Sequence, residues 1–428
     1  EASVLAGVGS GKIAWIHQSQ LLHQTWDAAG YVLEDPATGA GGYFVTYERL
    51  LTGLHADITF HSPQDLDVVT EPTDVVATID SEHEIASWTL STQAADGGEA
   101  VVLAAGSGTV TNETLGQFDP TLLLNGLYDI VLTARDALGQ TASEKISVVV
   151  EGQMKIGRFT LSYVDLAVPV SGLDIEIIRT YDSRDQQPRD FGVGWSLDIR
   201  QGSYRNNRTP GDGWQIQTGF LPCDTVLESK SHLTVVRLAD QEVYRFALRL
   251  ADGAPTGGGC FATARFDYID GPLPGTTLEI LGNDQVFYEN GSDQVIDVDT
   301  FELYEPEDVR LTTRDGRIFE LDLNDGVTRV EDLNGNQLSI TPEGVTHSSG
   351  KGITFERDAE GRIIRITDPL DRINTYAYDA EGDLASFIDR AAATTRFTYD
   401  DHRLMDIEDP RGVKPIRNEY DAEGRLVR

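Results

Sequence analysis

Three stretches near the C-terminus share one pattern: Arg357-Asp-Ala-Glu-Gly-Arg362, Tyr378-Asp-Ala-Glu-Gly-Asp383 and Tyr420-Asp-Ala-Glu-Gly-Arg425. Their aspartates, together with Asp400, recur every 21 residues. The copy at Tyr399-Asp-Asp-His402 lacks the glycine and one residue, and an extra residue after Asp409-Pro410 restores the period. A fixed period of this length is the signature of a repeat architecture.

Each repeat predicts two short strands joined by a tight turn. Glycine or proline interrupts the chain about every ten residues, which is too often for stable helices. In Thr395-Arg-Phe-Thr-Tyr399, bulky and polar side chains alternate as they do along a strand. Aspartate can bond the backbone two residues on, and glycine accepts positive φ, so we expect Gly382 and Gly424 at φ > 0. One hairpin is marginally stable alone, so successive units should pair into one continuous sheet.

The same residues resemble the YD repeats of bacterial Rhs proteins, Tc-toxin shell subunits and teneurins. The resemblance assigns a structural role to Tyr378, Asp379, Gly382, Tyr399, Asp400, Tyr420, Asp421 and Gly424. Arg179-Thr-Tyr-Asp182, Asp190-Phe-Gly-Val-Gly-Trp195 and Glu331-Asp-Leu-Asn-Gly-Asn336 resemble the usual lead-in to such repeats. The family implies a hollow β-shell of hairpins, which in Rhs and Tc-type members encloses a toxic C-terminal domain.

The chain divides into four parts on this interpretation, and the fold class is all-β. Residues 1–71 form an N-terminal segment in which Gly30-Tyr-Val-Leu-Glu-Asp-Pro-Ala-Thr-Gly39 resembles the tail of a transglutaminase-like domain. Residues 72–151 read as an immunoglobulin- or fibronectin-like sandwich, because short strand-like pieces alternate with turn signals. Residues 152–354 form a β lead-in, and residues 355–428 form the repeats, a curved sheet of hairpins. Across residues 152–428 we expect essentially no helix longer than two turns.

The charge of the chain is strongly negative. It carries 70 Asp and Glu against 34 Lys and Arg, a formal net charge of −36. Such a charge favours solubility and argues against nucleic acid or an anionic membrane as a partner. The 74 residues from Phe355 hold 17 acidic and 12 basic residues, a mixture that suits cross-strand pairing. The excess of acidic over basic residues in the whole chain is interpreted as a solvated acidic surface or, alternatively, as calcium-loaded turns.

Motifs that could carry chemistry are incomplete. Gly7-Val-Gly-Ser-Gly-Lys-Ile13 lacks the first glycine and the Ser or Thr of a phosphate loop. His17 and His23 are six residues apart, outside the spacing of a helical zinc motif, and with Asp27 they have no nearby cysteine nucleophile. We therefore expect no catalytic, cofactor-binding or metal residue; calcium remains the one cofactor considered. Asp332-Leu-Asn-Gly-Asn336 has oxygen side chains at calcium-loop spacing, but an Asn-Gly hairpin turn is favoured.

The only two cysteines are Cys223 and Cys260. A disulfide between them and two buried free thiols both remain open. Two cysteines are too few for a disulfide-dense scaffold or an all-cysteine zinc site.

The functional expectation is a non-enzymatic scaffold: part of a secreted or surface-displayed bacterial shell that encapsulates or displays a C-terminal effector. The first and last residues are interpreted as cuts in a longer chain, so the remainder of that chain is the expected partner, with a toxin or a cell-surface glycan as further partners. The alternative is an adhesin or carbohydrate-binding module that uses the repeat tyrosines as an aromatic surface. The sequence contains no stretch of about 20 apolar residues, so we expect no membrane-spanning helix in it. We also expect removal of residues 355–428 to raise solubility by deleting an open strand edge.

Overall fold

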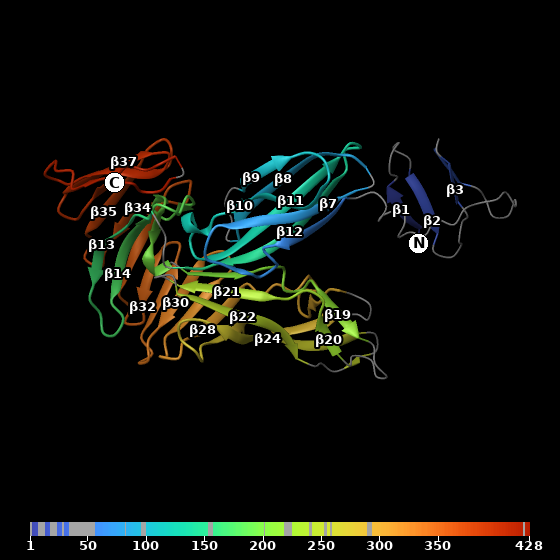
Figure 1. Cartoon of the computed structure of the whole chain (residues 1–428). Helices are drawn as coiled ribbons and strands as arrows, with labels where there is room; N and C mark the ends of the chain where they lie inside the picture. The colour runs from blue at the N-terminus through green and yellow to red at the C-terminus, as the bar shows by residue number, and fades with distance from the viewer. Residues whose placement is uncertain are drawn as a thin grey trace.

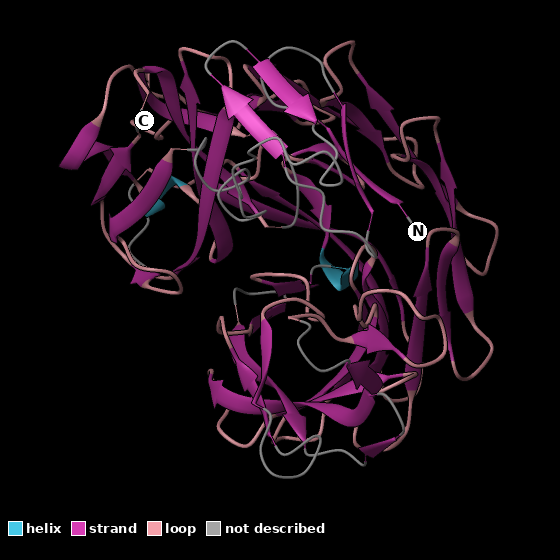
Figure 2. Cartoon of the chain, turned by 90° about the vertical axis from the view of Figure 1, so that its right-hand side faces the viewer, coloured by secondary structure: helices cyan, strands magenta, loops and turns pink. Residues whose placement is uncertain are grey.

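The computed structural model describes residues 56–428 except 82, 96–99, 153–156, 201, 218–224, 239–241, 252–254, 257–258, 289–292 and 423; before residue 56 it describes only the backbone of four strands. The regular secondary structure of the described chain is almost entirely strand, as the sequence predicts, and its two helical elements are single 3-10 turns at Pro120–Leu122 and Asp198–Arg200 (Figure 2). Near the N-terminus, β1 (Ala2–Ala6) pairs with β2 (Ile13–His17) and β3 (Gln24–Asp27) with β4 (Gly30–Leu33). The side chains of His17, His23 and Asp27 lie outside the described residues, as do Lys12, Cys223 and the side chain of Cys260.

Two antiparallel sheets form a sandwich between residues 57 and 150. One sheet has the order β10 (Val110–Phe118), β7 (Thr73–Asp80), β5 (Asp57–Ser62). The other has the order β6 (Val68–Val69), β12 (Thr141–Val150), β11 (Gly126–Asp136), β8 (Ile85–Ala94), β9 (Val101–Gly106), with β6 parallel to β12. Both this strand arrangement and the division into two sheets are those of the immunoglobulin-like class. Alternate residues of β7 and β11, among them Val75 and Ile130, are buried in the core between the sheets.

The structure corrects the predicted start of the sandwich. Strands β5 and β6 lie before residue 72, where the sequence placed the boundary, yet both are paired in the sandwich sheets. Strand β10 has no clear strand signal in the sequence, because most of its residues are exposed and its polar sequence does not alternate. Pairing with β7 holds it in place through two irregularities in register.

The lead-in comprises a small sheet and a larger one. The small sheet has the order β13 (Thr160–Val168), β14 (Ile175–Asp182), β17 (Trp195–Leu197), and β15 (Pro188–Arg189) pairs with β16 (Gly192–Val193) beside it. The larger sheet has the order β18 (Gly202–Asn206), β21 (Leu233–Leu238), β22 (Val243–Ala251), β24 (Gly259–Asp270), β26 (Gln285–Tyr288), β27 (Ile296–Asp297), with β23 (Pro255–Thr256) beside β24. A separate hairpin pairs β19 (Trp214–Gln217) with β20 (Thr225–Glu228). The sandwich lies against β21 and β22 (Figure 1).

A single antiparallel sheet of 13 strands contains the repeats. Apart from β25, it is a meander in which each strand pairs with the next in sequence, which confirms the predicted continuous sheet. Its strands are β25 (Thr277–Leu281), β28 (Asp308–Thr312), β29 (Ile318–Asp322), β30 (Gly326–Glu331), β31 (Gln337–Thr341), β32 (Gly344–His347), β33 (Gly352–Arg357), β34 (Ile363–Thr367), β35 (Ile373–Tyr378), β36 (Leu384–Ile388), β37 (Thr394–Asp400), β38 (Arg403–Glu408) and β39 (Ile416–Arg417). The sheet therefore crosses residue 354 without a break, and the predicted boundary between lead-in and repeats is not a structural one.

One hydrophobic core joins the lead-in to the 13-stranded sheet. It includes Tyr181 and Trp195 from the small lead-in sheet, Phe246 from the larger one, and Phe397 and Leu404 from the repeats. The opposite face of the repeat strands is solvent-exposed. Acidic and basic side chains on this face pair with each other across neighbouring strands. Cross-strand ion pairs occur on this face, as the mixed charges of the repeats led us to expect: Glu356–Arg365 at 3.1 Å, Arg396–Glu408 at 3.6 Å and Asp406–Arg417 at 3.2 Å.

Candidate functional site: a buried anchor beneath the repeats

A charged residue interrupts the apolar face of β14. Ile175, Ile177, Arg179 and Tyr181 alternate along this strand and are all buried, so Arg179 lies in a row of hydrophobic side chains. Burying an unpaired guanidinium would cost many kcal/mol, so its environment must supply partners.

Asp165 is the charged partner of Arg179. A register shift in the pairing of β13 with β14 between Val164 and Leu166 leaves Asp165 at a bulge. Its carboxylate accepts two hydrogen bonds from Arg179, from Nε at 2.8 Å and from Nη2 at 3.1 Å, and both side chains are 1% exposed. The repeats complete the site: Tyr376 donates its hydroxyl to the Asp165 carboxylate at 3.0 Å, and Asn374 donates Nδ2 to the Asp165 carbonyl at 2.8 Å.

Aromatic rings surround the guanidinium of Arg179. Its central carbon lies 4.5 Å from the ring centroid of Trp195 and 5.3 Å from that of Phe397. Nη1 has no hydrogen-bond acceptor among the described residues, and the guanidinium that carries it lies over these aromatic rings. Lead-in and repeats both contribute to the cage, whose other rings are Tyr163, Phe191, Tyr376 and Phe387.

Arg179, Asp165 and Tyr376 together form what we call the Arg179 anchor. Their electrostatic environment keeps the arginine and the tyrosine protonated. Burial alone would lower the pKa of Arg179, but the charge and hydrogen bonds of Asp165 outweigh it, so the pKa is raised. Burial, with the neighbouring charge of Asp165, raises the pKa of Tyr376 well above its usual value. Neither group exchanges a proton near neutral pH, so this arrangement is suited to fixing two sheets together rather than to acid–base chemistry.

The tyrosines of the repeat motif point inward and are mostly buried. Tyr378 donates its hydroxyl to the carbonyl of Ile363 at 2.5 Å, and Tyr420 donates to the carbonyl of Leu404 at 3.2 Å. The hydroxyl of Tyr399 accepts a hydrogen bond from Nε1 of Trp195 in the lead-in at 2.7 Å. Two of these tyrosines therefore tie one repeat to the preceding one, and the third ties the repeats to the lead-in.

The motif aspartates and glycines form the predicted turns. Oδ1 of Asp379 accepts the backbone N–H of Asp383 at 2.8 Å, and Oδ1 of Asp421 accepts that of Arg425 at 2.7 Å. Gly382 has φ 93° and Gly424 has φ 80°, which confirms the left-handed prediction for both. At Asp379 this geometry is a type I turn followed by a left-handed bulge residue.

The shortened copy makes a different turn. Asp401 and His402 both have positive φ, 48° and 60°, so Asp400 leads into a two-residue turn whose central residues are both left-handed. His402 Nδ1 lies 3.0 Å from Asp383, which stands where the neighbouring copies have arginine. Burial raises the pKa of Asp383. The loss of one residue noted in the sequence therefore changes the turn type and leaves the sheet intact.

A second row of equivalent turns lies at the opposite ends of the repeat strands and was missed in the sequence. Asp368, Asp389 and Asp409 each accept backbone N–H groups two and four residues on. Their left-handed residues are Asp371, Ala392 and Gly412, of which only one is glycine. In the sequence these turns are marked only by aspartates about 21 residues apart. They lack the recurring glycine that identifies the first row of turns.

The Asp332 loop is a hairpin turn, as favoured. Oδ1 of Asp332 accepts the N–H groups of Asn334 and Asn336, and Oδ2 accepts Nδ2 of Asn336 at 2.8 Å. Both carboxylate oxygens are thus held by N–H donors. Over the described ranges, no group of three or more His, Cys, Asp and Glu side chains is arranged to hold a metal ion.

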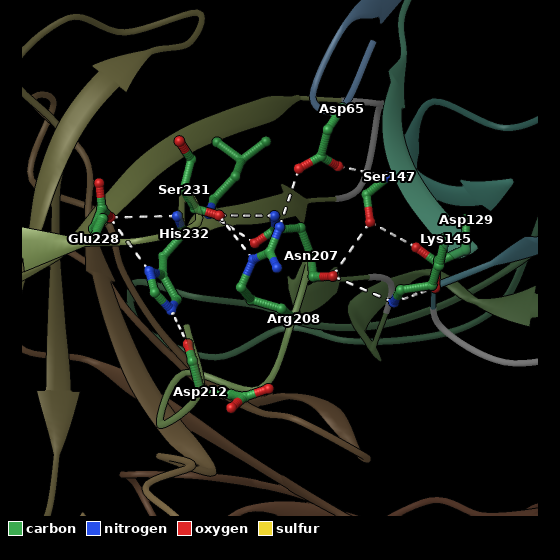
Figure 3. A network of polar contacts seen from close by, with 11 residues as sticks. Asp65, Asp129, Lys145, Ser147, Asn207, Arg208, Asp212, Glu228, Ser231 and His232 are labelled. Carbon is green, nitrogen blue, oxygen red and sulfur yellow. Dashed lines mark hydrogen bonds and ion pairs between the residues drawn. The ribbon is translucent and has the colours of Figure 1, made fainter. Parts of the chain in front are cut away.

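A polar network joins the sandwich to the lead-in (Figure 3). The carbonyl of Asn207 accepts hydrogen bonds from Ser147 at 3.2 Å and Lys145 at 3.4 Å, and Arg208 pairs with Asp65 at 3.0 Å. Within the lead-in, next to this network, the ring of His232 stacks on the ring of Trp214, and the two ring centroids are 4.3 Å apart. An apolar contact of Leu127 and Val149 with Leu233 and Val235 supports the same junction.

Comparison with known proteins identifies one region. Residues 153–209, which carry the Arg179 anchor, match the family model of a domain of unknown function, DUF6531. No curated protein matches the chain. Among the described residues, no helix is long and apolar enough to cross a membrane.

Proposed function

We propose that the chain is a non-enzymatic scaffold of the Rhs/YD-repeat type: the first part of a β-shell, with an immunoglobulin-like domain in front of it. The observation that carries the proposal is the shared core between the lead-in and the inner face of the hairpin sheet. A sheet of hairpins with one apolar face must pack that face against another part of the chain, and the lead-in provides that surface. The Arg179 anchor fixes the position of the sheet on the lead-in.

The resemblance to YD-repeat proteins supports the remaining parts of the proposal. It implies secretion or display on a bacterial surface, further repeats in the same polypeptide, and a C-terminal effector inside the shell. It also implies that the residues of the repeat motif act by holding turns and strands rather than by binding a ligand.

The alternative, an adhesin with an aromatic carbohydrate-binding surface, is less well supported. Such surfaces need exposed ring faces, whereas Tyr378, Tyr399 and Tyr420 are largely buried and their hydroxyls are engaged within the protein.

Electron cryomicroscopy of the natural polypeptide that contains this segment tests the scaffold. We expect a closed hollow shell in which residues 157–428 form part of the wall, and a C-terminal domain that resists protease until the shell is opened. An extended particle without a chamber would contradict the proposal. Glycan-array binding by this chain that is lost in Tyr378→Phe and Tyr399→Phe would support the adhesin instead.

A further inference from the structure

Phe301 combines an exposed apolar side chain with an unfavourable backbone conformation. It lies in a loop, residues 297–302, that follows β27 and leads to Leu303, which forms an isolated bridge with Ile296. The residue is 75% exposed and contributes to none of the hydrophobic clusters of the described chain. Its φ is 61°, in the left-handed region that bulky residues avoid and glycine accepts.

Burial within the chain does not offset this strain at Phe301. Among the described residues, Leu66 is the other large apolar residue with positive φ, 70°. Leu66 packs against the apolar cluster at the junction of sandwich and lead-in, so burial stabilises its conformation. Phe301 has no such contact. A strained residue that adds no packing to its own fold is a candidate for a function outside that fold.

Hydrogen bonds hold the Phe301 loop in one conformation. The carbonyl of Asp297 accepts the N–H of Phe301 at 3.0 Å, and the N–H of Asp297 donates to the carbonyl of Glu302 at 2.9 Å. Oδ1 of Asp297 accepts the N–H groups of Asp299 at 2.7 Å and Thr300 at 2.9 Å. The ring is therefore presented on a preorganised loop, which reduces the conformational entropy lost when a partner binds.

The sequence around the Phe301 loop is acidic throughout. Residues 293–308 contain seven Asp and Glu and no Lys or Arg. Six of the seven are exposed, and none of the seven forms an ion pair with a described residue. Asp308 lies opposite Asp322 in the pairing of β28 with β29, and burial together with the carboxylates of Asp322 and Glu307 raises the pKa of Asp308. These like charges repel one another, and a basic partner would relieve the repulsion.

This charge selects the class of partner. Nucleic acid and anionic membrane surfaces would be repelled by the carboxylates. A second copy of the chain carries the same net charge of −36 and would be repelled as well. A basic protein surface fits both features, because its Lys and Arg oppose the carboxylates while an apolar pocket accepts the ring. Aromatic anchors in pockets carry much of the energy of protein interfaces, and complementary charge around them speeds association.

We propose that the Phe301 loop docks on a basic surface of another protein, with Phe301 in an apolar pocket and the carboxylates of residues 293–308 facing Lys and Arg around that pocket. The interaction goes beyond the scaffold role and does not depend on it, since the loop and its acidic surroundings belong to the described residues of this chain.

Thermal unfolding of the whole chain tests whether Phe301 serves its own fold. Phe301→Gly should raise the melting temperature, because glycine accepts the positive φ and no packing is lost. Leu333→Gly is the matched control, since Leu333 is 78% exposed without positive φ, and it should not raise the melting temperature. A lower melting temperature for Phe301→Gly would show that the ring packs within the chain and would overturn the proposal.

Calorimetric titration with a basic amphipathic peptide tests the docking itself. The probe is a 14-residue helix of leucine and lysine, and the same helix with glutamate in place of lysine is its control. We expect saturable binding of the basic peptide that weakens with added NaCl, and no comparable binding of the acidic one. Phe301→Gly should weaken binding of the basic peptide at least tenfold, and Leu333→Gly should leave it unchanged. Equal binding by the parent chain and Phe301→Gly would refute the role of the ring.

Neutralising the carboxylates separates local charge from the net charge of the chain. Combining Asp299→Asn, Glu302→Gln and Glu305→Gln should weaken binding of the basic peptide at least tenfold. A control variant removes the same number of exposed acidic charges from the sandwich and should bind as the parent chain does: Glu71→Gln, Glu113→Gln and Glu144→Gln. If the two triple variants weaken binding equally, the peptide responds to net charge alone and the proposal fails.

Discussion

Individual turn residues of the repeats adopt a backbone conformation that L-amino acids avoid. Gly382 accepts φ 93° without strain, but on the other row of turns Ala392 adopts φ 62° and Asp371 adopts φ 59°. A left-handed residue other than glycine costs roughly 1–2 kcal/mol. Pairing with both neighbouring strands stabilises these turns despite that cost.

Exchanging alanine and glycine at the two rows of turns should change stability in opposite directions. We expect Gly382→Ala to lower the free energy of unfolding by about 1 kcal/mol and Gly382→Val to lower it further, because a β-branched residue resists positive φ. Ala392→Gly should raise it by up to about 1 kcal/mol for the same reason. Urea unfolding at pH 7 measures both. An unchanged midpoint for Gly382→Val would mean that the turn does not constrain its backbone.

Asp368 should give the repeats a specific sensitivity to acid. Burial opposes ionisation, but hydrogen bonds from Arg372, Leu370 and Arg390 outweigh it and lower the pKa of Asp368 to about 2. A carboxyl whose pKa is depressed on folding stabilises the protein above its unfolded pKa of about 3.9, and this contribution is lost as the pH falls toward 2. Asp368→Asn should therefore destabilise the chain at pH 7 and much less at pH 2. Parallel stability–pH curves for the two proteins between these values would contradict this account.

Two elements, strand β14 of the lead-in and the repeat strands above it, meet at the Arg179 anchor. The position of Arg179 follows from strand periodicity, but its partners come from β13 and from repeat strands about 200 residues away. This arrangement links the register of the lead-in sheet to that of the repeat sheet, since a one-residue slip in either would turn the charged or aromatic partners to the other face.

Removing the arginine should be far more harmful than removing an exposed one. Arg179→Met leaves the Asp165 carboxylate buried without its ion pair, and we expect a loss of about 3–5 kcal/mol in the free energy of unfolding. Adding Asp165→Asn to that variant should recover part of the loss. Arg396→Met is the matched control, because its pair with Glu408 is exposed and contributes at most about 1 kcal/mol. Similar losses for Arg179→Met and Arg396→Met would refute the role of the anchor.

For the whole molecule, the shared core reverses one expectation drawn from the sequence. Residues 355–428 were expected to reduce solubility through an open strand edge. The structure instead places eight buried residues of this segment in the core that covers the lead-in: Phe355, Ile363, Ile366, Tyr376, Leu384, Phe397, Leu404 and Ile407. Without them, Trp195, Tyr181 and Phe191 would face water.

Truncation before Phe355 should therefore lower solubility. We expect the shortened chain to aggregate more than the full chain at equal ionic strength and to bind a hydrophobic dye that the full chain does not bind. Sedimentation and dye fluorescence provide the measurements. A monomeric truncated chain with a cooperative thermal transition would show that the lead-in folds without its repeats.

Local sequence determined much of this protein. The period of 21, the Asp-x-x-Gly turns and the alternation of apolar residues specify hairpins, because turn conformation and strand faces depend on residues a few positions apart. The same signals indicated an all-β sandwich before the lead-in.

Only the tertiary structure decided which elements share a core. The row of turns with Ala392 and Asp371 in the left-handed region has no glycine signal, and β10 and β5 are strands because their neighbours pair with them. Nothing near Arg179 in the sequence indicates its partners. Such contacts form between residues distant in sequence, where the energy of burial and pairing, rather than local conformational preference, selects the arrangement.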